Sequence, residues 1–166
     1  MIRSASLADA ASIARIYNFY VRETIVTFEE EAVSEGEMAA RLRQVEEASL
    51  PWLAAEEAGE VSGYAYATAW KSRRGYRFSA EVTVYVDQAR GGRGIGSALY
   101  ERLLPTLQAL GIHAAMGGIA LPNAASVALH EKFGFDKVAH FREVGLKFDR
   151  WIDVGYWEKV LLPVPQ

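Results

Sequence analysis

The chain has no cysteine among its 166 residues. Disulfide bonds and cysteine-ligated zinc sites are therefore excluded. Histidine is also scarce, and the three that occur, His113, His130 and His140, lack the spacing of metal ligands. We therefore predict no bound metal.

Long apolar runs and an excess of positive charge are missing as well. No stretch approaches the roughly 20 apolar residues of a membrane span, and residues 1–12 lack the apolar core of a signal peptide. The 18 basic residues against 21 acidic ones give a formal net charge of −3, which argues against nucleic-acid binding. We expect a cytoplasmic protein with neither a membrane nor a nucleic-acid partner.

No linker and no internal repeat interrupts the chain, so we predict a single domain spanning residues 1–166. Ser6 and Ser34 begin capping boxes ahead of helical stripes, and Ala58-Gly59 predicts a hairpin turn. Strands that mostly neighbour one another indicate an α+β fold, with a mixed, mostly antiparallel sheet flanked by helices. The predicted strands are 2–5, 53–57, 61–70, 77–86, 113–119, 135–144 and 151–161. Two predicted helices follow Ser6 and Ser34, and two more span residues 98–110 and 123–132.

Pro105 lies inside the apolar stripe of the helix predicted over residues 98–110. Proline removes a backbone donor and clashes with the carbonyl four residues earlier, which predicts a kink or an early end there. Gly111 suits a helix stop.

The most informative segment is a strand that runs into a glycine-rich loop and then a helix. Residues 82–97 read VTVYVDQARGGRGIGS. Glycines let the backbone approach a phosphate closely, and the free N–H groups of a helix start point at it. Arg90 and Arg93 add positive charge. The segment predicts a ligand with a phosphate or pyrophosphate group.

Two common phosphate-binding motifs do not fit this loop. A P-loop requires lysine after its second glycine, but Ser97 follows Gly96. A dinucleotide-binding loop requires G-x-G-x-x-G, and its third glycine position holds Ser97 or Leu99, depending on the starting residue. Nucleoside triphosphates and NAD are therefore disfavoured.

A second segment, residues 122–135, reads PNAASVALHEKFGF and follows the strand-like run HAAMGGIA. In this order and separation, the two segments resemble the GNAT superfamily of acyl-CoA-dependent N-acetyltransferases. The resemblance implies that the glycine loop cradles the CoA pyrophosphate and that Asn123 contacts the pantetheine region. Gly94 and Gly96 match the family's loop glycines, whereas Gly91 stands where the family has Gln or Arg.

Longer segments are similar to phosphinothricin acetyltransferases and their amino-acid-acylating relatives, including those acting on methionine sulfoximine and sulfone. They read YNFYVRETIVTFEE, AWKSRRGYRFSAEVTVYV, LPNAASVALHEKFGF and VGLKFDRWIDVGYW. The resemblance covers nearly the whole chain and implies the GNAT fold, acetyl-CoA as co-substrate and a homodimer. The residues that it implies at the cofactor are Val84, Tyr85, Val86, Gly91, Gly92, Arg93, Gly94, Ile95, Gly96, Ser97, Asn123 and Ser126.

Acetyl transfer to an amine requires a base, a polarised carbonyl and a stabilised thiolate leaving group. Glu81 matches the family's catalytic glutamate and is the candidate base; the alternative is a surface glutamate. His130, seven residues after Asn123, occupies the position whose side chain acts on the departing sulfur in the family. Its ordinary pKa of about 6.5 allows both a proton donor and an orienting residue. Without cysteine, no acetyl-cysteine intermediate can form.

Cationic and aromatic residues in the resembling segments suit a small amino acid with an anionic or strongly polar side chain. Arg73 is the first candidate, because its guanidinium can pair with a carboxylate or phosphinate in bidentate fashion. Residues 71–77, KSRRGYR, could equally form a solvated loop, and the aromatic residues could belong to the core. The candidate substrate-binding residues are Phe28, Trp70, Lys71, Arg73, Tyr76, Lys147 and Trp151.

The sequence thus predicts transfer of acetyl from acetyl-CoA to the α-amine of a small amino acid or analogue, such as phosphinothricin, by direct attack in a ternary complex. One alternative is an acetyltransferase for a polyamine, an aminoglycoside or a protein N-terminus, which would favour an acidic pocket. The other is a CoA-binding sensor without turnover, and the presence of Glu81 and His130 argues against it.

Overall fold

The computed structural model describes residues 1–161. Within this range one seven-stranded sheet runs in the order β1-β2-β3-β4-β5-β7-β6, and only the pair β4 and β5 is parallel. The predicted mixed, mostly antiparallel sheet is therefore confirmed. The strands are β1 (Ile2–Ser4), β2 (Trp52–Glu57), β3 (Glu60–Ala69), β4 (Ser79–Val86), β5 (Ala114–Leu121), β6 (Asp136–Lys147) and β7 (Arg150–Val160), and the α-helices are α1 (Ala10–Glu23), α2 (Glu35–Glu47), α3 (Ile95–Ala109) and α4 (Ala124–Lys132).

Local signals in the sequence produce the turns and helix starts that they predict. Ala58 and Gly59 have φ of +52° and +80°, the left-handed values that a tight hairpin between β2 and β3 requires. Before α2, Glu37 N–H donates to Ser34 Oγ at 3.2 Å, and Ser34 N–H donates to the Glu37 carboxylate at 2.8 Å. This capping box satisfies backbone donors that the helix itself leaves unpaired.

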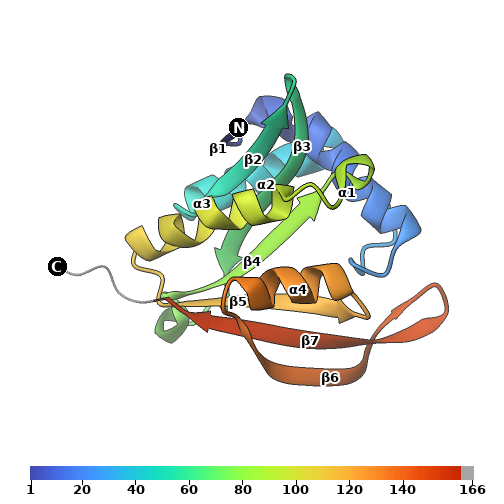
Figure 1. Ribbon diagram of the computed structural model, residues 1–166, viewed down its shortest axis with the longest axis vertical. Helices are drawn as coiled ribbons and strands as arrows, with labels where there is room; N and C mark the ends of the chain where they lie inside the picture. The colour runs from blue at the N-terminus through green and yellow to red at the C-terminus, as the bar shows by residue number, and fades with distance from the viewer. Residues whose placement is uncertain (162–166) are drawn as a thin grey trace.

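Helices cover both faces of the sheet (Figure 1). α1 and α2 bury Ile13 and Met38 on one face, and α3 buries Leu99 on the other. Alternate residues of β4 serve the two cores, with Val82 on the α3 side and Tyr85 against the α1–α2 side. The predicted alternation of this strand is therefore confirmed, and it fixes which β4 side chains reach the site described below.

α3 runs through Pro105 without ending, so the predicted early end there is wrong. Pro105 lies on the exposed side of the helix, and the residue whose carbonyl it leaves without a donor, Glu101, is exposed as well. Water can therefore satisfy the carbonyl, while Leu103 and Leu107 stay fully buried on the opposite side. The helix does stop before Gly111, which has a φ of +81°.

β4 and β5 pair only at their beginnings. The parallel ladder joins residues 79–81 to residues 114–116 and then stops. Beyond Glu81, β4 continues beside β3 alone, and β5 continues beside β7. The two strands diverge into a fork in the middle of the sheet (Figure 1), so one edge of β4 offers backbone groups that no strand pairs.

β6 and β7 form a long hairpin at the edge of the sheet (Figure 1). β6 runs on to Lys147, beyond the predicted end at residue 144, through an irregularity between Phe141 and Gly145 at which Glu143 has a φ of +51°. None of the helices described within residues 1–161 has the length and apolar character needed to cross a membrane.

Candidate active site

The fork between β4 and β5 opens into a cavity of about 480 Å³, walled by β4, the glycine loop and α4. Among the predicted cofactor residues, Arg93 alone does not line it; Arg93 is exposed on the loop. The predicted residues that do line the cavity are Val84, Tyr85, Val86, Gly91, Gly92, Gly94, Ile95, Gly96, Ser97, Asn123 and Ser126. The structure thus brings two segments that are distant in sequence to one elongated site.

The glycine loop presents backbone donors to this cavity. Gly92 and Gly94 have φ of +75° and +79°, values that are strained for any residue with a Cβ. Gly94 is the N-cap of α3, and its carbonyl accepts the first helical hydrogen bond, from Ala98 N–H at 3.0 Å. The N–H groups of residues 95–97 therefore have no helical partner. Together with the helix dipole, they suit a pyrophosphate.

The charged residues around the loop have different roles. Arg90 forms an ion pair with Glu60, which ties the loop to the β2–β3 hairpin. Lys132, at the end of α4, lines the cavity and donates from Nζ to Ser97 Oγ at 2.9 Å. The prediction missed Lys132, although the helical period places it on the same side of α4 as Leu129.

A smaller cavity of about 180 Å³ contains both predicted catalytic residues, Glu81 and His130, in its wall. Glu81 is the last residue of β4 that pairs with β5, so it lies where the fork begins. Burial raises the pKa of the Glu81 carboxyl above its ordinary value, and the nearby positive charge of Lys71 opposes this effect. A carboxylate with a raised pKa is a better proton acceptor.

His130 is buried, with both ring nitrogens occupied. Nδ1 lies 2.8 Å from the carbonyl oxygen of Ser126, which can only accept, so Nδ1 carries the hydrogen. Nε2 lies 3.0 Å from the hydroxyl of Tyr100 on α3 and accepts from it. Burial lowers the pKa of His130, so the ring is neutral. This arrangement links α3 to α4, the two helices beside the cofactor cavity.

Hydroxyl-bearing residues that the prediction missed complete the smaller cavity: Tyr17, Thr27, Tyr66 and Thr83. Burial and the neighbouring Glu29 raise the pKa of Tyr17 to about 12, so its hydroxyl stays protonated. Strand alternation places Thr83 on the face of Glu81, and Tyr66 lies opposite Thr83 in the β3–β4 register. These two could have been found from the sequence, whereas no local pattern points to Tyr17.

A third cavity, of about 470 Å³, also has Glu81 in its wall. Phe28 is the one predicted substrate residue that lines it within the part of the chain described; its other wall residues are Val26, Gly118, Ala120, Phe141, Val144, Val154 and Tyr156. Trp70 packs edge-on against Tyr156 with ring centroids 5.4 Å apart, and Lys71 Nζ lies 5.2 Å from the Trp70 ring centroid. Trp70 and Lys71 therefore lie beside this cavity.

The other predicted substrate residues lie apart. Arg73 and Tyr76 belong to the exposed turn before β4 and line none of these three cavities. Trp151 is 64% exposed and borders a separate surface hollow. Lys147 is only 1% exposed, and its Nζ donates to the Thr27 carbonyl at 2.7 Å.

Across residues 1–161, no three His, Asp or Glu side chains are gathered as metal ligands would be.

These features define a class of protein. The start of α3 suits a pyrophosphate, and the unpaired edge of β4 suits an extended ligand. Glu81 places a carboxylate at the base of the fork. Together these features accommodate an acyl-CoA beside an acceptor. The class is that of the acyl-CoA-dependent acyltransferases.

Comparison with known proteins gives the family. Residues 2–155 match the model of the acetyltransferase (GNAT) domain, and the chain belongs to this family. It is an N-acetyltransferase that uses acetyl-CoA. The predicted family and fold are therefore confirmed.

Its relatives narrow the group further. The chain is 39% identical to a phosphinothricin N-acetyltransferase of Streptomyces viridochromogenes, over 99% of this chain and 90% of that protein. It is 37% identical to the L-methionine sulfoximine/L-methionine sulfone acetyltransferase of Salmonella typhimurium, over 95% and 92%. The solved structure of yncA from Salmonella typhimurium, with its cofactor acetyl-CoA, matches with a TM-score of 0.95 at 36% identity, over 98% and 94%. The chain is thus an acetyltransferase of the group that includes these amino-acid acetyltransferases.

Proposed function

We propose that this protein acetylates the α-amine of a small amino acid or amino-acid analogue, of the kind named for its phosphinothricin and methionine sulfoximine/sulfone relatives. The observation that carries the proposal is the position of Glu81. Glu81 borders both the small cavity beside the cofactor site and the larger apolar one beside Phe28. A base in this position can take a proton from an amine held on one side while the acetyl group is held on the other.

In this mechanism Glu81 takes a proton from the acceptor ammonium, directly or through one water, so that the amine gains the lone pair for attack on the carbonyl. Asn123 and Ser126 border both the cofactor cavity and the small cavity. They place the start of α4 near the departing sulfur, where the helix dipole stabilises negative charge. Since no cysteine can carry the acetyl group, it passes straight to the amine. The thioester C–S bond breaks after the C–N bond has formed, and the second amine proton goes to the departing thiolate.

Of the two roles considered for His130, the geometry favours orientation over proton donation. Both ring nitrogens are engaged, one by a backbone carbonyl and the other by Tyr100. His130 then keeps α4 in place against α3 and so shapes the cofactor cavity.

A panel of amines tests the proposed function, with release of free CoA as the readout. Phosphinothricin, methionine sulfoximine and methionine sulfone should be acetylated at the α-amine, as mass spectrometry of the product would show. A clear preference for spermidine, an aminoglycoside or a peptide N-terminus would contradict the proposed amino-acid substrate. Acetyl-CoA binding without turnover of any amine would instead favour a sensor.

Arg73→Ala tests whether Arg73 pairs with an anionic group of the acceptor amino acid. Arg73 lies in the exposed basic turn before β4, lines none of the three cavities, and makes none of the described ion pairs within residues 1–161. A role in binding therefore requires the acceptor's anionic group to reach out to this turn. Loss of a charge-assisted hydrogen bond, about 1.5–3 kcal/mol, should raise the Michaelis constant roughly tenfold to a hundredfold. Equal losses for an amino acid and its methyl ester would show that Arg73 maintains the turn instead.

We also propose a homodimer formed through the β6–β7 hairpin. Seven large apolar side chains there are about half exposed or more: Val138, Phe141, Val144, Leu146, Phe148, Trp151 and Val160. An apolar surface of this kind on an edge hairpin is typical of an interface. Because Phe141 and Val144 also line the cavity beside Glu81, a second copy would cover the outer side of that cavity.

A further inference from the structure

The acceptor side of the active site is walled by a segment with neither helix nor strand. Residues 24–34 connect α1 to α2, and we call them the acceptor loop. Thr27 from this loop lines the small cavity, and Phe28 lines the larger one, each together with Glu81. A loop placed by few backbone contacts is mobile unless side chains hold it. Its own side-chain contacts therefore decide where the acceptor is held.

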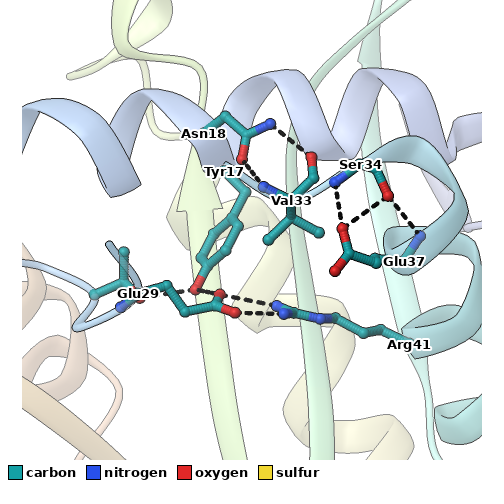
Figure 2. A network of polar contacts seen from close by, with 8 residues as sticks. Tyr17, Asn18, Glu29, Val33, Ser34, Glu37 and Arg41 are labelled. Carbon is teal, nitrogen blue, oxygen red and sulfur yellow. Dashed lines mark hydrogen bonds and ion pairs between the residues drawn. The ribbon is translucent and has the colours of Figure 1, made fainter. Parts of the chain in front are cut away.

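Contacts with α1 and α2 hold one side of the acceptor loop (Figure 2). Glu29 forms an ion pair with Arg41, and the same carboxylate accepts a hydrogen bond from the Tyr17 hydroxyl. Since that hydroxyl donates to Glu29, its oxygen must accept from the Thr27 hydroxyl, 2.7 Å away. The chain of donors therefore runs from Thr27 to Tyr17 to Glu29, with Arg41 at the far end.

Two further contacts in Figure 2 fix the end of the loop. The Asn18 side chain exchanges two hydrogen bonds with the backbone of Val33, at 2.7 and 2.8 Å, and Ser34 forms its capping box with Glu37. On the α1–α2 side, the loop is thus anchored both at Thr27 and where it enters α2.

The other side of the loop is held by the β6–β7 hairpin through a buried lysine. Lys147 comes from the end of β6, is 1% exposed, and donates from Nζ to the Thr27 carbonyl at 2.7 Å. Its described hydrogen-bond partner is thus a neutral carbonyl, although burying an ammonium without a hydrogen-bonded carboxylate is unfavourable. Glu29 and Glu30 supply negative charge nearby. An apolar side chain would fill the same space without this penalty.

Phe28 meets the same hairpin one residue further along the loop. A Cβ added to Gly145 would lie 2.2 Å from the Phe28 ring, so the ring packs directly on the Gly145 backbone. Gly145 and Lys147 are two residues apart on β6 and therefore point to the same side of the strand. The hairpin thus holds two successive loop residues, and both line cavities that contain Glu81.

We propose that Lys147 is a positioning residue, which fixes the acceptor loop against β6 through the Thr27 carbonyl and thereby sets the affinity for the amine substrate. This inference rests on the proposed function and revises the predicted role of Lys147, because its ammonium acts through Thr27 and does not contact the substrate.

The test compares Lys147→Met with Lys159→Met. Lys159 is the matched control, because its Nζ also donates to a backbone carbonyl, that of Phe133 at 2.6 Å, away from the acceptor loop. Lys147→Met should raise the Michaelis constant for the amine by about tenfold or more, as displacement of a substrate-holding segment does, with acetyl-CoA kinetics little changed. Methionine sulfone and its methyl ester should be affected alike, and Lys159→Met should affect neither.

Hydrogen exchange provides a readout that does not depend on activity. Amides of residues 24–30 should exchange faster in Lys147→Met than in wild type or in Lys159→Met. Gly145→Ala, which displaces the Phe28 ring and keeps the lysine, should likewise raise both the exchange rate and the Michaelis constant for the amine.

An unchanged exchange rate together with an unchanged Michaelis constant in Lys147→Met would overturn the proposal. It would also be overturned by a loss confined to methionine sulfone, with its methyl ester unaffected and exchange unchanged, because Lys147 would then bind the carboxylate directly. If wild type acetylates no amine, the proposed function fails, while the exchange comparison still decides whether Lys147 holds the loop.

Discussion

At the scale of single residues, the role of base that we propose for Glu81 makes two opposing demands on its carboxyl group. A general base must be ionised to accept a proton, but the burial of Glu81 disfavours its ionised form and raises its pKa. Lys71 partly offsets the effect of burial. The residue is therefore suited to catalysis and poorly suited to stability, and the two properties can be measured separately on one variant.

Glu81→Gln should lower turnover by about one hundredfold or more, because a neutral amide cannot accept the proton. In wild type, kcat/KM should rise with pH through the raised pKa of Glu81, since only the ionised carboxylate is active. The variant should lack this rise, and its deficit should shrink at high pH, where the amine is already deprotonated. The measurement is a pH–rate profile of both proteins, with acetyl-CoA binding by calorimetry as the control. Turnover at the wild-type level near neutral pH would dismiss Glu81 as the base.

The same Glu81→Gln substitution should stabilise the fold at neutral pH. Because the pKa of Glu81 is raised on folding, its contribution to stability is present below the ordinary carboxyl pKa and is lost as the pH rises through the folded pKa. Above that range the ionised group opposes folding, and glutamine removes this effect. Thermal melts should show a higher Tm for the variant at neutral pH, with the difference vanishing in acid. A lower Tm for the variant at neutral pH would mean that the ionised carboxylate stabilises the folded state, contrary to the prediction.

At the scale of elements, the glycine loop should tolerate no bulky residue at its helix cap. Gly94→Val should weaken acetyl-CoA binding far more than amine binding, since valine disfavours the φ of +79° that aims the α3 amides at the cofactor. Gly59→Val is the matched control, because Gly59 has a φ of +80° and equally open surroundings but lies in the β2–β3 turn. Calorimetry should show reduced acetyl-CoA affinity for Gly94→Val alone, and equal affinities in the two folded variants would contradict the assignment of the loop.

Pro105→Ala should stabilise α3, because the helix continues through this residue and alanine restores the missing backbone donor. Proline inside a helix costs about 3 kcal/mol relative to alanine. Against this, alanine has more conformational freedom than proline in the unfolded chain, which disfavours folding by roughly 0.4–1 kcal/mol. The net gain is therefore about 2–2.6 kcal/mol in the free energy of unfolding. Urea denaturation measures it, and a decrease would show that proline is needed for the local geometry of α3.

At the scale of the whole molecule, the exposed hairpin should govern assembly. The double substitution Val138→Glu and Leu146→Glu places charge in the proposed interface at sites that are 54% and 50% exposed, so folding should be unaffected. Sedimentation should show a dimer for wild type and a monomer for this variant. Leu110→Glu, at a site 51% exposed beyond the end of α3, is the control and should remain dimeric. A monomeric wild type would contradict the proposed homodimer.

Turns and helix starts that depend on residues close together in the chain could be predicted from the sequence. Capping boxes at Ser6 and Ser34 and the turn at Ala58-Gly59 depend on residues within a few positions of each other, and all three form as predicted. Pro105 shows the limit, because local propensity alone predicted a kink or an early helix end, whereas the helix continues past it with the opposite side of α3 buried.

The active site shows the same division between local and distant contacts. Nearly all predicted cofactor residues line one cavity, because they lie in two contiguous segments that the resemblance had already paired. Tyr17 and the position of Lys147 against Thr27 escaped prediction, since α1, the acceptor loop and β6 meet only after the chain has folded.

The sequence by itself determined the family, through the segments that carry the resemblance, and most of the helix and strand pattern, which short-range residue patterns encode. Through the same resemblance it also named the candidate phosphate-binding loop and the candidate base. Only the tertiary structure decided that β4 and β5 part after Glu81, which nitrogen of His130 carries the hydrogen, and that a buried lysine holds the acceptor loop. The physical reason is that these depend on pairing, burial and hydrogen bonds between segments far apart in the chain, and such contacts leave no periodic trace in the sequence.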